Sequence, residues 1–199
     1  MERGAHAALA FGGSAGSIDA LLKIFLTLPG EFKLPIITVC HLHPLDEGGL
    51  VEIFSRQIQL KVKEAEDKEQ IEPGFIYFPP ANYHLLVERD KTFALSVDAK
   101  VNYSRPSIDV FFESAAVAWG DELIGILLTG ASRDGAAGID AINIHGGLTI
   151  AQDPSEAVHP MMPQAAIDSG KVERILSITE IIRFLQRLSA DNNDCAKKA

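Results

Sequence analysis

The sequence predicts an α/β fold, a three-layer, doubly wound arrangement in which a mostly parallel sheet carries helices on both faces and an antiparallel β-hairpin extension. Short apolar runs alternate with stretches of helical periodicity, which is typical of successive βαβ units. The runs at 34–41 and 122–128 are almost entirely apolar, as in parallel strands buried on both faces. Glycine-rich turns follow the runs at 7–11 and 122–128 and lead directly into helices.

In the first half of the chain, apolar spacing predicts strands and helices in alternation, followed by antiparallel β structure. Apolar side chains at i, i+3, i+4, i+7 and i+8 predict a helix at 18–26, which Pro29 and Gly30 end. The segments 71–80, 83–88 and 93–98 surround a polar turn and predict the antiparallel extension. The remaining elements expected here are strands at 7–11, 34–41 and 60–63 and a short helix at 50–57.

In the second half, the same reasoning predicts a strand-helix alternation up to a final amphipathic helix. Ser107 is expected to cap the helix at 107–119, and Ser177 with Glu180 has the spacing of a capping box. We expect residues 1–190 to form a single domain and residues 191–199 to form a polar tail. The remaining elements expected here are strands at 122–128 and 148–152 and helices at 136–144, 164–169 and 178–188.

Composition excludes several classes of protein. The formal net charge of −9 argues against a general affinity for nucleic acid or for an anionic membrane. No apolar run approaches the ~20 residues of a membrane span, and the N-terminal apolar stretch is too short for a signal peptide. Cys40 and Cys195 lie far apart and do not suggest a disulfide framework. We therefore expect a protein of the cytoplasm with no membrane insertion.

The segment Phe11-Gly-Gly-Ser-Ala-Gly-Ser17 places a lone serine, Ser14, where a buried strand turns into a helix. Gly12, Gly13 and Gly16 permit the sharp turn of a nucleophile elbow. A plain turn, with Ser14 or Ser17 capping the helix, is the simpler interpretation. The pattern argues against a dinucleotide-binding loop, because serines occupy the second and third glycine positions of G-x-G-x-x-G and the next strand ends without an acidic residue.

Two further reactive side chains follow predicted parallel strands, His41 after 34–41 and Asp134 after 122–128. The carboxyl ends of parallel strands lie at one edge of a sheet, so we expect Ser14, His41 and Asp134 to converge there. An imidazole that removes the serine proton and a carboxylate that orients the imidazole are what acyl transfer by serine requires. The backbone N–H of Ala15, at a helix start, is an expected donor to the oxyanion.

Each of these residues also has another interpretation. Asp134 precedes a predicted helix and has the position of a simple N-cap. His41 and His43 face one side of a strand and are candidate ligands of a metallohydrolase, with His84 or Asp134 as a third ligand. Cys40 is not expected to act with His41, because adjacent strand residues face opposite sides.

Six segments in order resemble the signature blocks of the CheB-type chemotaxis protein-glutamate methylesterase catalytic domain: GGSAGS, VCHLHP, PGFIYFPPANYHL, SRPSIDVFF, GILLTGASRDGAAG and MPQAAI. The resemblance runs from about residue 7 to 187. It implies Ser14 as nucleophile, His41 as general base and Asp134 as the carboxylate. It also implies hydrolysis of glutamate γ-methyl esters on chemoreceptor cytoplasmic helices, with release of methanol, often with deamidation of glutamines, and without a cofactor or metal.

The chain departs from the family pattern at three positions near these residues. Ala15 replaces a frequent threonine, Ser17 a frequent glycine and Ala131 a common methionine. The backbone N–H of Ala131 remains a candidate second oxyanion donor. Because the three matched positions are intact, a non-catalytic interaction module of the same fold is the rival hypothesis and not the main one.

The turn before Asp134 supplies further candidates. Gly130 and Gly135 are expected to shape it, and Arg133 is either a contact to an acidic receptor surface or a plainly solvated arginine. Members of the family are usually regulated by an N-terminal receiver domain, which we do not expect within these 199 residues. A separate receiver protein or domain is the partner that the resemblance implies for regulation.

Overall fold

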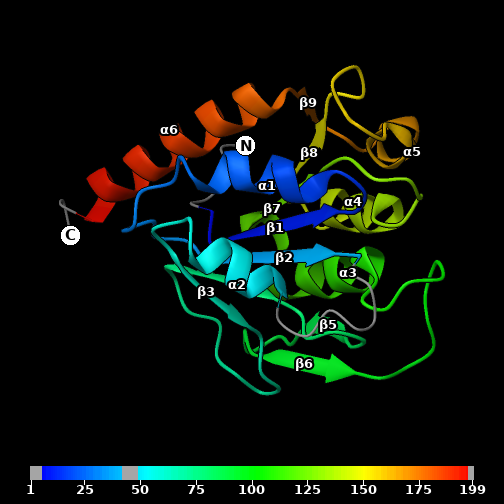
Figure 1. Cartoon of the computed structure of the whole chain (residues 1–199), viewed down its shortest axis with the longest axis horizontal. Helices are drawn as coiled ribbons and strands as arrows, with labels where there is room; N and C mark the ends of the chain where they lie inside the picture. Colours follow the sequence, from blue (N-terminus) through cyan, green and yellow to red (C-terminus); the bar gives the residue numbers. More distant parts are fainter. Residues whose placement is uncertain (1–5, 42–48, 197–199) are drawn as a thin grey trace.

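Seven parallel strands form one sheet in the computed structural model, which describes residues 6–41 and 49–196 (Figure 1). The strand order is β3-β4-β2-β1-β7-β8-β9, and a separate antiparallel pair, β5 and β6, lies beside the sheet. The predicted α/β class with a hairpin extension is confirmed. The strands are β1 (Ala8–Gly13), β2 (Ile36–Cys40), β3 (Lys61–Glu64), β4 (Phe75–Phe78), β5 (His84–Val87), β6 (Phe93–Ser96), β7 (Leu123–Leu127), β8 (Leu148–Gln152) and β9 (Arg174–Leu176).

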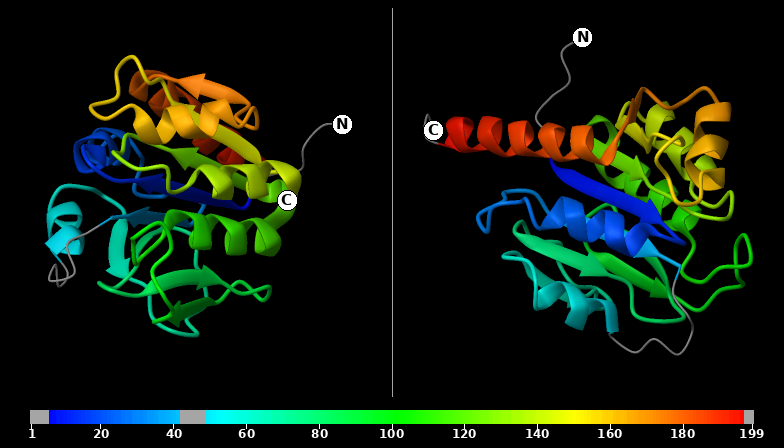
Figure 2. Two further views of the ribbon diagram at one scale, coloured as in Figure 1. Left: turned by 90° about the vertical axis from the view of Figure 1, so that its right-hand side faces the viewer. Right: turned by 45° about the horizontal axis from the view of Figure 1, so that its top comes forward.

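Helices cover both faces of the sheet, so the molecule has three layers (Figure 2). One apolar core joins the sheet to the helices α1 (Ser17–Phe25), α2 (Gly49–Ser55) and α6 (Ile178–Ala196). The other core joins it to α3 (Ile108–Trp119), α4 (Ala136–Ile144), α5 (Met161–Asp168) and the hairpin. A single 3₁₀ turn, Gly120–Glu122, leads into β7.

The central strand β1 explains why both cores are needed. Its side chains alternate between the two faces, with Leu9 and Phe11 in one core and Ala8 and Ala10 in the other, and all four are fully buried. The small alanines allow α3 to lie close against this strand. Among the described residues, no helix is long and apolar enough to cross a membrane.

Four elements differ from the sequence-based prediction. The segment 75–78, predicted within the antiparallel extension, is the parallel strand β4 between β3 and β2. Three of its four side chains are buried, because one apolar core packs on each face of the sheet. The strand β9 was not predicted, since its three residues are exposed or half-exposed and show no apolar pattern. Helix α5 begins at Met161, because Pro163 fits within a first helical turn. Helix α6 continues to Ala196, through part of the predicted polar tail, because no glycine or proline interrupts it.

The register of the central strands brings the candidate residues together. Gly13 of β1 pairs with Cys40 of β2, and Gly12 pairs with Leu127 of β7. The residues that follow these strands therefore meet at one edge of the sheet. Gly12 is required there because a Cβ at this position would lie 2.5 Å from Ile108 Cγ2 of helix α3.

Candidate active site

Ser14 lies at the apex of a tight turn between β1 and α1. Its backbone N–H donates to Thr129 O (3.0 Å), and its carbonyl accepts from the Ser17 N–H (2.9 Å) and the Ser17 hydroxyl (2.6 Å). Gly16 has a φ of 81° and is the N-cap of α1, with no side-chain cap. The interpretation of Ser14 or Ser17 as a simple helix cap is therefore wrong.

The backbone around Ser14 leaves little room for larger residues. A Cβ at Gly13 would lie 2.5 Å from Ser17 Cβ, and a Cβ at Gly16 would lie 2.9 Å from Val158 Cβ. The Ser17 hydroxyl lies 3.6 Å from the Cys40 thiol on the neighbouring strand. Ser17, which replaces a frequent glycine of the family pattern, thus fixes the Ser14 carbonyl and packs against β2.

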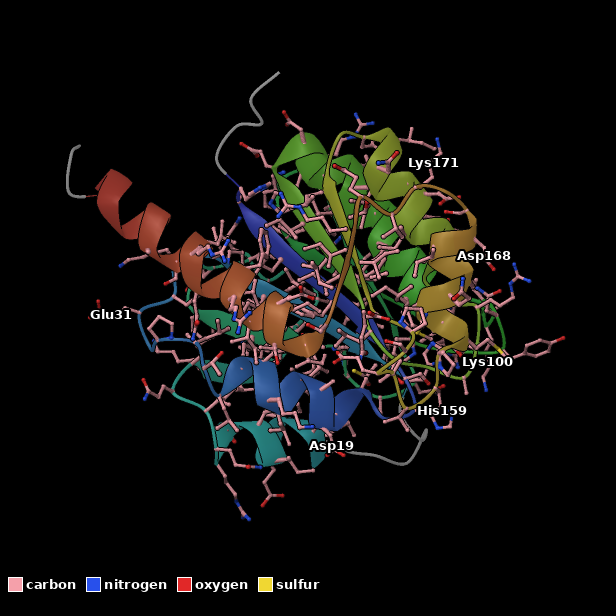
Figure 3. All side chains as sticks on the ribbon, turned by 90° about the horizontal axis from the view of Figure 1, so that it is seen from above. Asp19, Glu31, Lys100, His159, Asp168 and Lys171 are labelled. Carbon is pink, nitrogen blue, oxygen red and sulfur yellow. The ribbon has the colours of Figure 1, made fainter. Side chains whose placement is uncertain are left out.

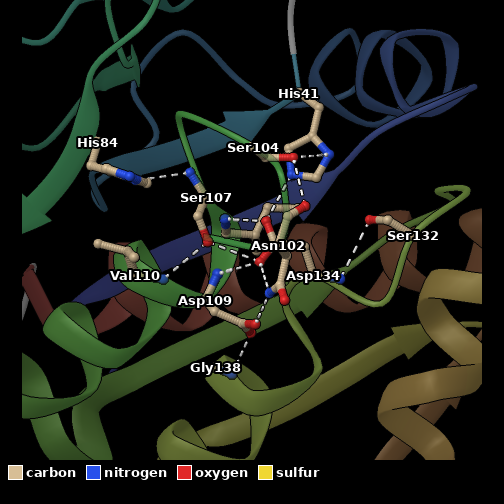
Figure 4. A network of polar contacts seen from close by, with 11 residues as sticks. His41, His84, Asn102, Ser104, Ser107, Asp109, Val110, Ser132, Asp134 and Gly138 are labelled. Atoms are coloured by element: carbon tan, nitrogen blue, oxygen red, sulfur yellow. Dashed lines mark hydrogen bonds and ion pairs between the residues drawn. The ribbon is translucent and has the colours of Figure 1, made fainter. Parts of the chain in front are cut away.

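His41 follows β2 directly and is oriented toward Asp134. Its backbone N–H donates to Gly13 O at 3.3 Å, and its side chain is 15% exposed. Nε2 of the ring lies 2.7 Å from Asp134 Oδ2, and Nδ1 lies 3.4 Å from the Ser104 hydroxyl (Figure 4). Nε2 therefore faces the Asp134 carboxylate, and Nδ1 is on the opposite side of the ring.

Asp134 is fully buried and accepts hydrogen bonds from several donors. The distances are 2.7 Å from the Ile108 N–H, 2.9 Å from the Ser107 hydroxyl and 2.9 Å from Asn102 Nδ2. Burial alone would raise the pKa of Asp134, but the hydrogen bonds from His41, Asn102, Ile108 and Ser107 outweigh it and hold this pKa below the usual range. The carboxylate is thus ionised beside the His41 ring.

The N-cap interpretation of Asp134 is wrong for the helix that follows it. Gly135, at a φ of 94°, is the N-cap of α4. Asp134 instead reaches the first turn of α3, where it accepts from Ile108 N and, at 3.3 Å, from Asp109 N. The positive end of α3 thereby contributes to the stability of the negative charge.

Three residues of this network were not identified from the sequence: Asn102, Ser104 and Asp109. Asn102 Nδ2 lies 2.7 Å from Asp109 Oδ2 and 2.9 Å from Asp134 Oδ1, so one amide group bridges the two carboxyls. Asp109 Oδ1 also accepts from Gly138 N at 2.8 Å. Burial, together with the nearby charge of Asp134, raises the pKa of Asp109 to about 6 despite that hydrogen bond. Of these three residues, Ser104 and Asp109 lie in the SRPSIDVFF block, which was the feature of the sequence that could have identified them.

The backbone N–H groups of Ala15 and Ala131, near Ser14, make no hydrogen bond to residues 6–41 and 49–196. Each follows the end of a central strand. The loop at Thr129 is fixed because its hydroxyl accepts from His159 N (2.8 Å) and lies within hydrogen-bond distance of Ala15 O (3.1 Å) and His159 O (3.2 Å). Gly130 N–H donates to His159 O at 3.0 Å, and a Cβ at Gly130 would meet the Met162 side chain at 2.6 Å. Arg133 is exposed at the rim of this turn.

The alternative chemistries find less support in the described part of the chain. His43 lies outside the described residues. His84 is buried in β5, where its Nε2 lies 3.1 Å from Ala99 O and its Nδ1 accepts from Ser107 N at 3.2 Å, so both ring nitrogens are already engaged. The Cys40 thiol is buried, and burial raises its pKa to about 11 although the Ser17 hydroxyl lowers it.

A comparison with models of known families matches residues 9–185 to CheB methylesterase. The chain belongs to the CheB methylesterase family. Among curated relatives, a "Putative protein-glutamate methylesterase/protein-glutamine glutaminase" of Leptospira interrogans is 44% identical over 187 residues, which are 94% of this chain and 97% of the relative. A protein-glutamate methylesterase/protein-glutamine glutaminase of Carboxydothermus hydrogenoformans is 39% identical over 175 residues, 85% of this chain but 52% of that protein.

A solved structure of the CheB methylesterase family has the same fold. The chain matches the crystal structure of the Thermotoga maritima CheB methylesterase catalytic domain with a TM-score of 0.87 and 32% sequence identity. The match covers 92% of this chain and 98% of that domain. The chain thus spans nearly the whole of the Leptospira and Thermotoga chains and about half the length of the Carboxydothermus protein.

Proposed function

We propose that this chain is a serine carboxylesterase that hydrolyses glutamate γ-methyl esters on chemoreceptor cytoplasmic helices, releases methanol, and deamidates receptor glutamines at the same site. Membership in the CheB methylesterase family supports the reaction, and the relatives' names support the substrate. We place this activity in the cytoplasm, with a separate receiver protein or domain as a candidate regulator. The observation that carries the proposal is the 2.7 Å contact of His41 with the buried, ionised Asp134 beside the Ser14 turn.

In the proposed mechanism Ser14 Oγ attacks the ester carbonyl carbon, and His41 removes the hydroxyl proton through Nδ1. Nε2 remains hydrogen-bonded to Asp134, which stabilises the imidazolium that forms. The negative charge on the carbonyl oxygen is met by the unpaired N–H groups of Ala15 and Ala131. His41 then protonates the departing methoxide, so methanol leaves and an acyl-enzyme remains on Ser14.

Water completes the proposed cycle. His41 removes a proton from a water molecule, the resulting hydroxide attacks the acyl carbon, and Ser14 Oγ recovers its proton as glutamate is released. With a glutamine substrate the same steps release ammonia in place of methanol. Every proton transfer uses His41 Nδ1, so the reaction needs no group beyond the side chains and backbone donors named above.

The structure offers a second serine that must be distinguished from Ser14. Ser104 Oγ lies 3.4 Å from His41 Nδ1, while Ser14 Oγ makes no hydrogen bond within the described ranges. We assign Ser14 as the nucleophile because it lies in the strand-to-helix turn between β1 and α1, directly before a free backbone donor, whereas Ser104 closes a β-turn with Val101.

The experiment measures methanol release from receptor-containing membranes that were methylated beforehand. Ser14→Ala is expected to fall to background, since loss of a triad serine costs up to about 10⁶-fold in turnover. Ser104→Ala, the matched control, is expected to stay within about tenfold of the unchanged protein, because it removes one weak hydrogen bond. Loss of activity in Ser104→Ala with activity kept in Ser14→Ala would reverse the assignment.

A fluorophosphonate probe separates the proposal from its rivals. The esterase is expected to react at Ser14, whereas a non-catalytic module of the same fold would not react. A protein that labels at Ser14 but releases no methanol would be a serine hydrolase with another ester as substrate. Activity that disappears with a chelator and returns with zinc would instead support the metallohydrolase.

A further inference from the structure

Residues 101–104 form a tight two-residue turn next to the catalytic histidine. Val101 and Ser104 exchange backbone hydrogen bonds of 3.2 Å and 2.9 Å. The two residues between them, Asn102 and Tyr103, have φ values of 49° and 63°. A turn with positive φ at both central positions favours Asn at the first and Gly at the second, so Asn102 fits this turn and Tyr103 does not.

The fold itself makes no use of the Tyr103 side chain. It is 97% exposed, and within the described ranges it has no hydrogen bond and no ring contact. A bulky side chain in the left-handed region is unfavourable and carries no packing benefit here. Strained residues of this kind cluster at functional sites, so the exposed ring requires an explanation outside the folded chain.

The residues before and after Tyr103 fix its position relative to the site. Asn102 donates to Asp134, and the Ser104 hydroxyl lies 3.4 Å from His41 Nδ1 (Figure 4). The ring is therefore presented by a turn whose other side chains belong to the catalytic network. An aromatic ring held in this way binds a partner with little loss of conformational entropy.

Apolar side chains are also exposed across the site from this turn. Val158 and Met161 are 69% and 55% exposed. Val158 precedes α5 and Met161 is its first residue, and His159 and Met162 beside them hydrogen-bond Gly130. Both segments extend beyond the carboxyl ends of the central strands (Figure 1). The labelled Lys100, which directly precedes the turn, and His159, next to Val158, lie at the same end of the molecule (Figure 3). A methyl ester group is too small to contact both sides, whereas a polypeptide that carries it is large enough.

We propose that Tyr103 is a substrate-contacting, specificity-determining residue whose ring packs on the polypeptide that carries the glutamate ester, opposite Val158 and Met161. This inference rests on the function proposed above. Because the contact is made by protein flanking the ester, it is the same before and in the transition state. It therefore changes the KM for a protein substrate and leaves the chemical step unaltered.

The test compares Tyr103→Asn, Tyr103→Phe and the unchanged protein on methylated receptor membranes and on a small fluorophosphonate probe. Asparagine tolerates positive φ, so Tyr103→Asn removes the ring but keeps the turn. We expect its KM for receptor to rise about tenfold, the effect typical of a truncated aromatic contact, with kcat and the rate of Ser14 labelling within twofold of the unchanged protein. Tyr103→Phe keeps the aromatic ring, so we expect its KM for receptor to equal that of the unchanged protein.

Ile144→Ala is the matched control, since Ile144 is 72% exposed at the end of α4 and its loss should change neither quantity. An unchanged KM in Tyr103→Asn would overturn the inference. Equal losses of receptor hydrolysis and probe labelling would also overturn it, because they would show that Tyr103 acts through the turn. If the unchanged protein labels at Ser14 but releases no methanol, the proposed function fails first and the inference falls with it.

Discussion

Asn102 donates one amide to two buried carboxyls, Asp109 at 2.7 Å and Asp134 at 2.9 Å. The two carboxyls have opposite environments. Asp134 receives enough hydrogen bonds to keep its pKa low, whereas burial and the neighbouring charge raise the pKa of Asp109 to about 6. Asp134 thus has a second titratable carboxyl close to it. We expect Asp134 to determine activity and Asp109 to determine how stability depends on pH.

Asp134→Asn is expected to reduce receptor demethylation about 10⁴-fold, the loss that this change causes in a serine protease triad. An amide at position 134 donates to His41 Nε2, which moves the ring proton to Nδ1 and leaves no acceptor for the Ser14 proton. Steady-state kinetics measure the loss, and circular dichroism checks that the variant is folded. Asp121→Asn, which changes an exposed carboxylate before β7, serves as control, and an equal loss there would refute the explanation.

Asp109→Asn is expected to change how stability depends on pH between about 4 and 6. The pKa of Asp109 rises from an ordinary value of 3.8 to about 6 on folding, so the folded state binds this proton more tightly than the unfolded chain. Its contribution to stability is therefore fully present below pH 3.8 and is lost as the pH rises to about 6. The free energy of unfolding of Asp109→Asn, measured in urea, should increase relative to the unchanged protein across this window.

The pH range of this effect distinguishes the contribution of Asp109 to stability from that of Asp134. The lowered pKa of Asp134 contributes stability that is complete above its ordinary value of 3.8 and is lost only at lower pH. The free energy of unfolding of Asp109→Asn is compared with that of the unchanged protein. If the difference between these two values stays constant from pH 4 to pH 6, Asp109 is not protonated preferentially in the folded state.

Gly12→Ala is expected to lower the free energy of unfolding by about 1–3 kcal/mol, the range for overpacking a core. The added Cβ would lie 2.5 Å from Ile108 Cγ2 and 2.9 Å from Leu127 Cδ1, so α3 or β7 must shift. Gly30→Ala is the control, since its Cβ would have an ordinary contact of 3.5 Å with Gln59 Cβ. Equal urea midpoints for the two variants would show that the core accommodates the methyl group without cost.

The sequence was most informative where local pattern and topology agree. Ser14, His41 and Asp134 each follow a run whose apolar character predicts a buried strand, and parallel pairing then brings them to one edge. The positions of Ala15, Ala131, Gly130 and Gly135 in the turns after these strands followed from the same local patterns. These positions were predictable because each depends on a few neighbouring residues.

Other parts of the site and fold depend on distant contacts. Asn102 and Ser104 reach Asp134 and His41 only because the turn between β6 and α3 folds back over the sheet edge, and no short pattern encodes that path. The direction of β4 was mispredicted for the same reason, since a four-residue apolar strand has no feature that distinguishes parallel from antiparallel pairing. Asp134 accepts from the first turn of α3 and not of α4, and this choice of helix likewise could not be predicted without the three-dimensional structure.

The place of β1 between β2 and β7 has a consequence for protein synthesis. A nascent chain that has left the ribosome only as far as β6 contains Ser14 and His41, but it lacks Asp134, the Ala131 donor and the Thr129 carbonyl that holds the Ser14 backbone. We therefore expect hydrolytic capacity to arise only when β7 and the turn that follows it have joined the sheet, and truncated chains that end before this strand to lack it.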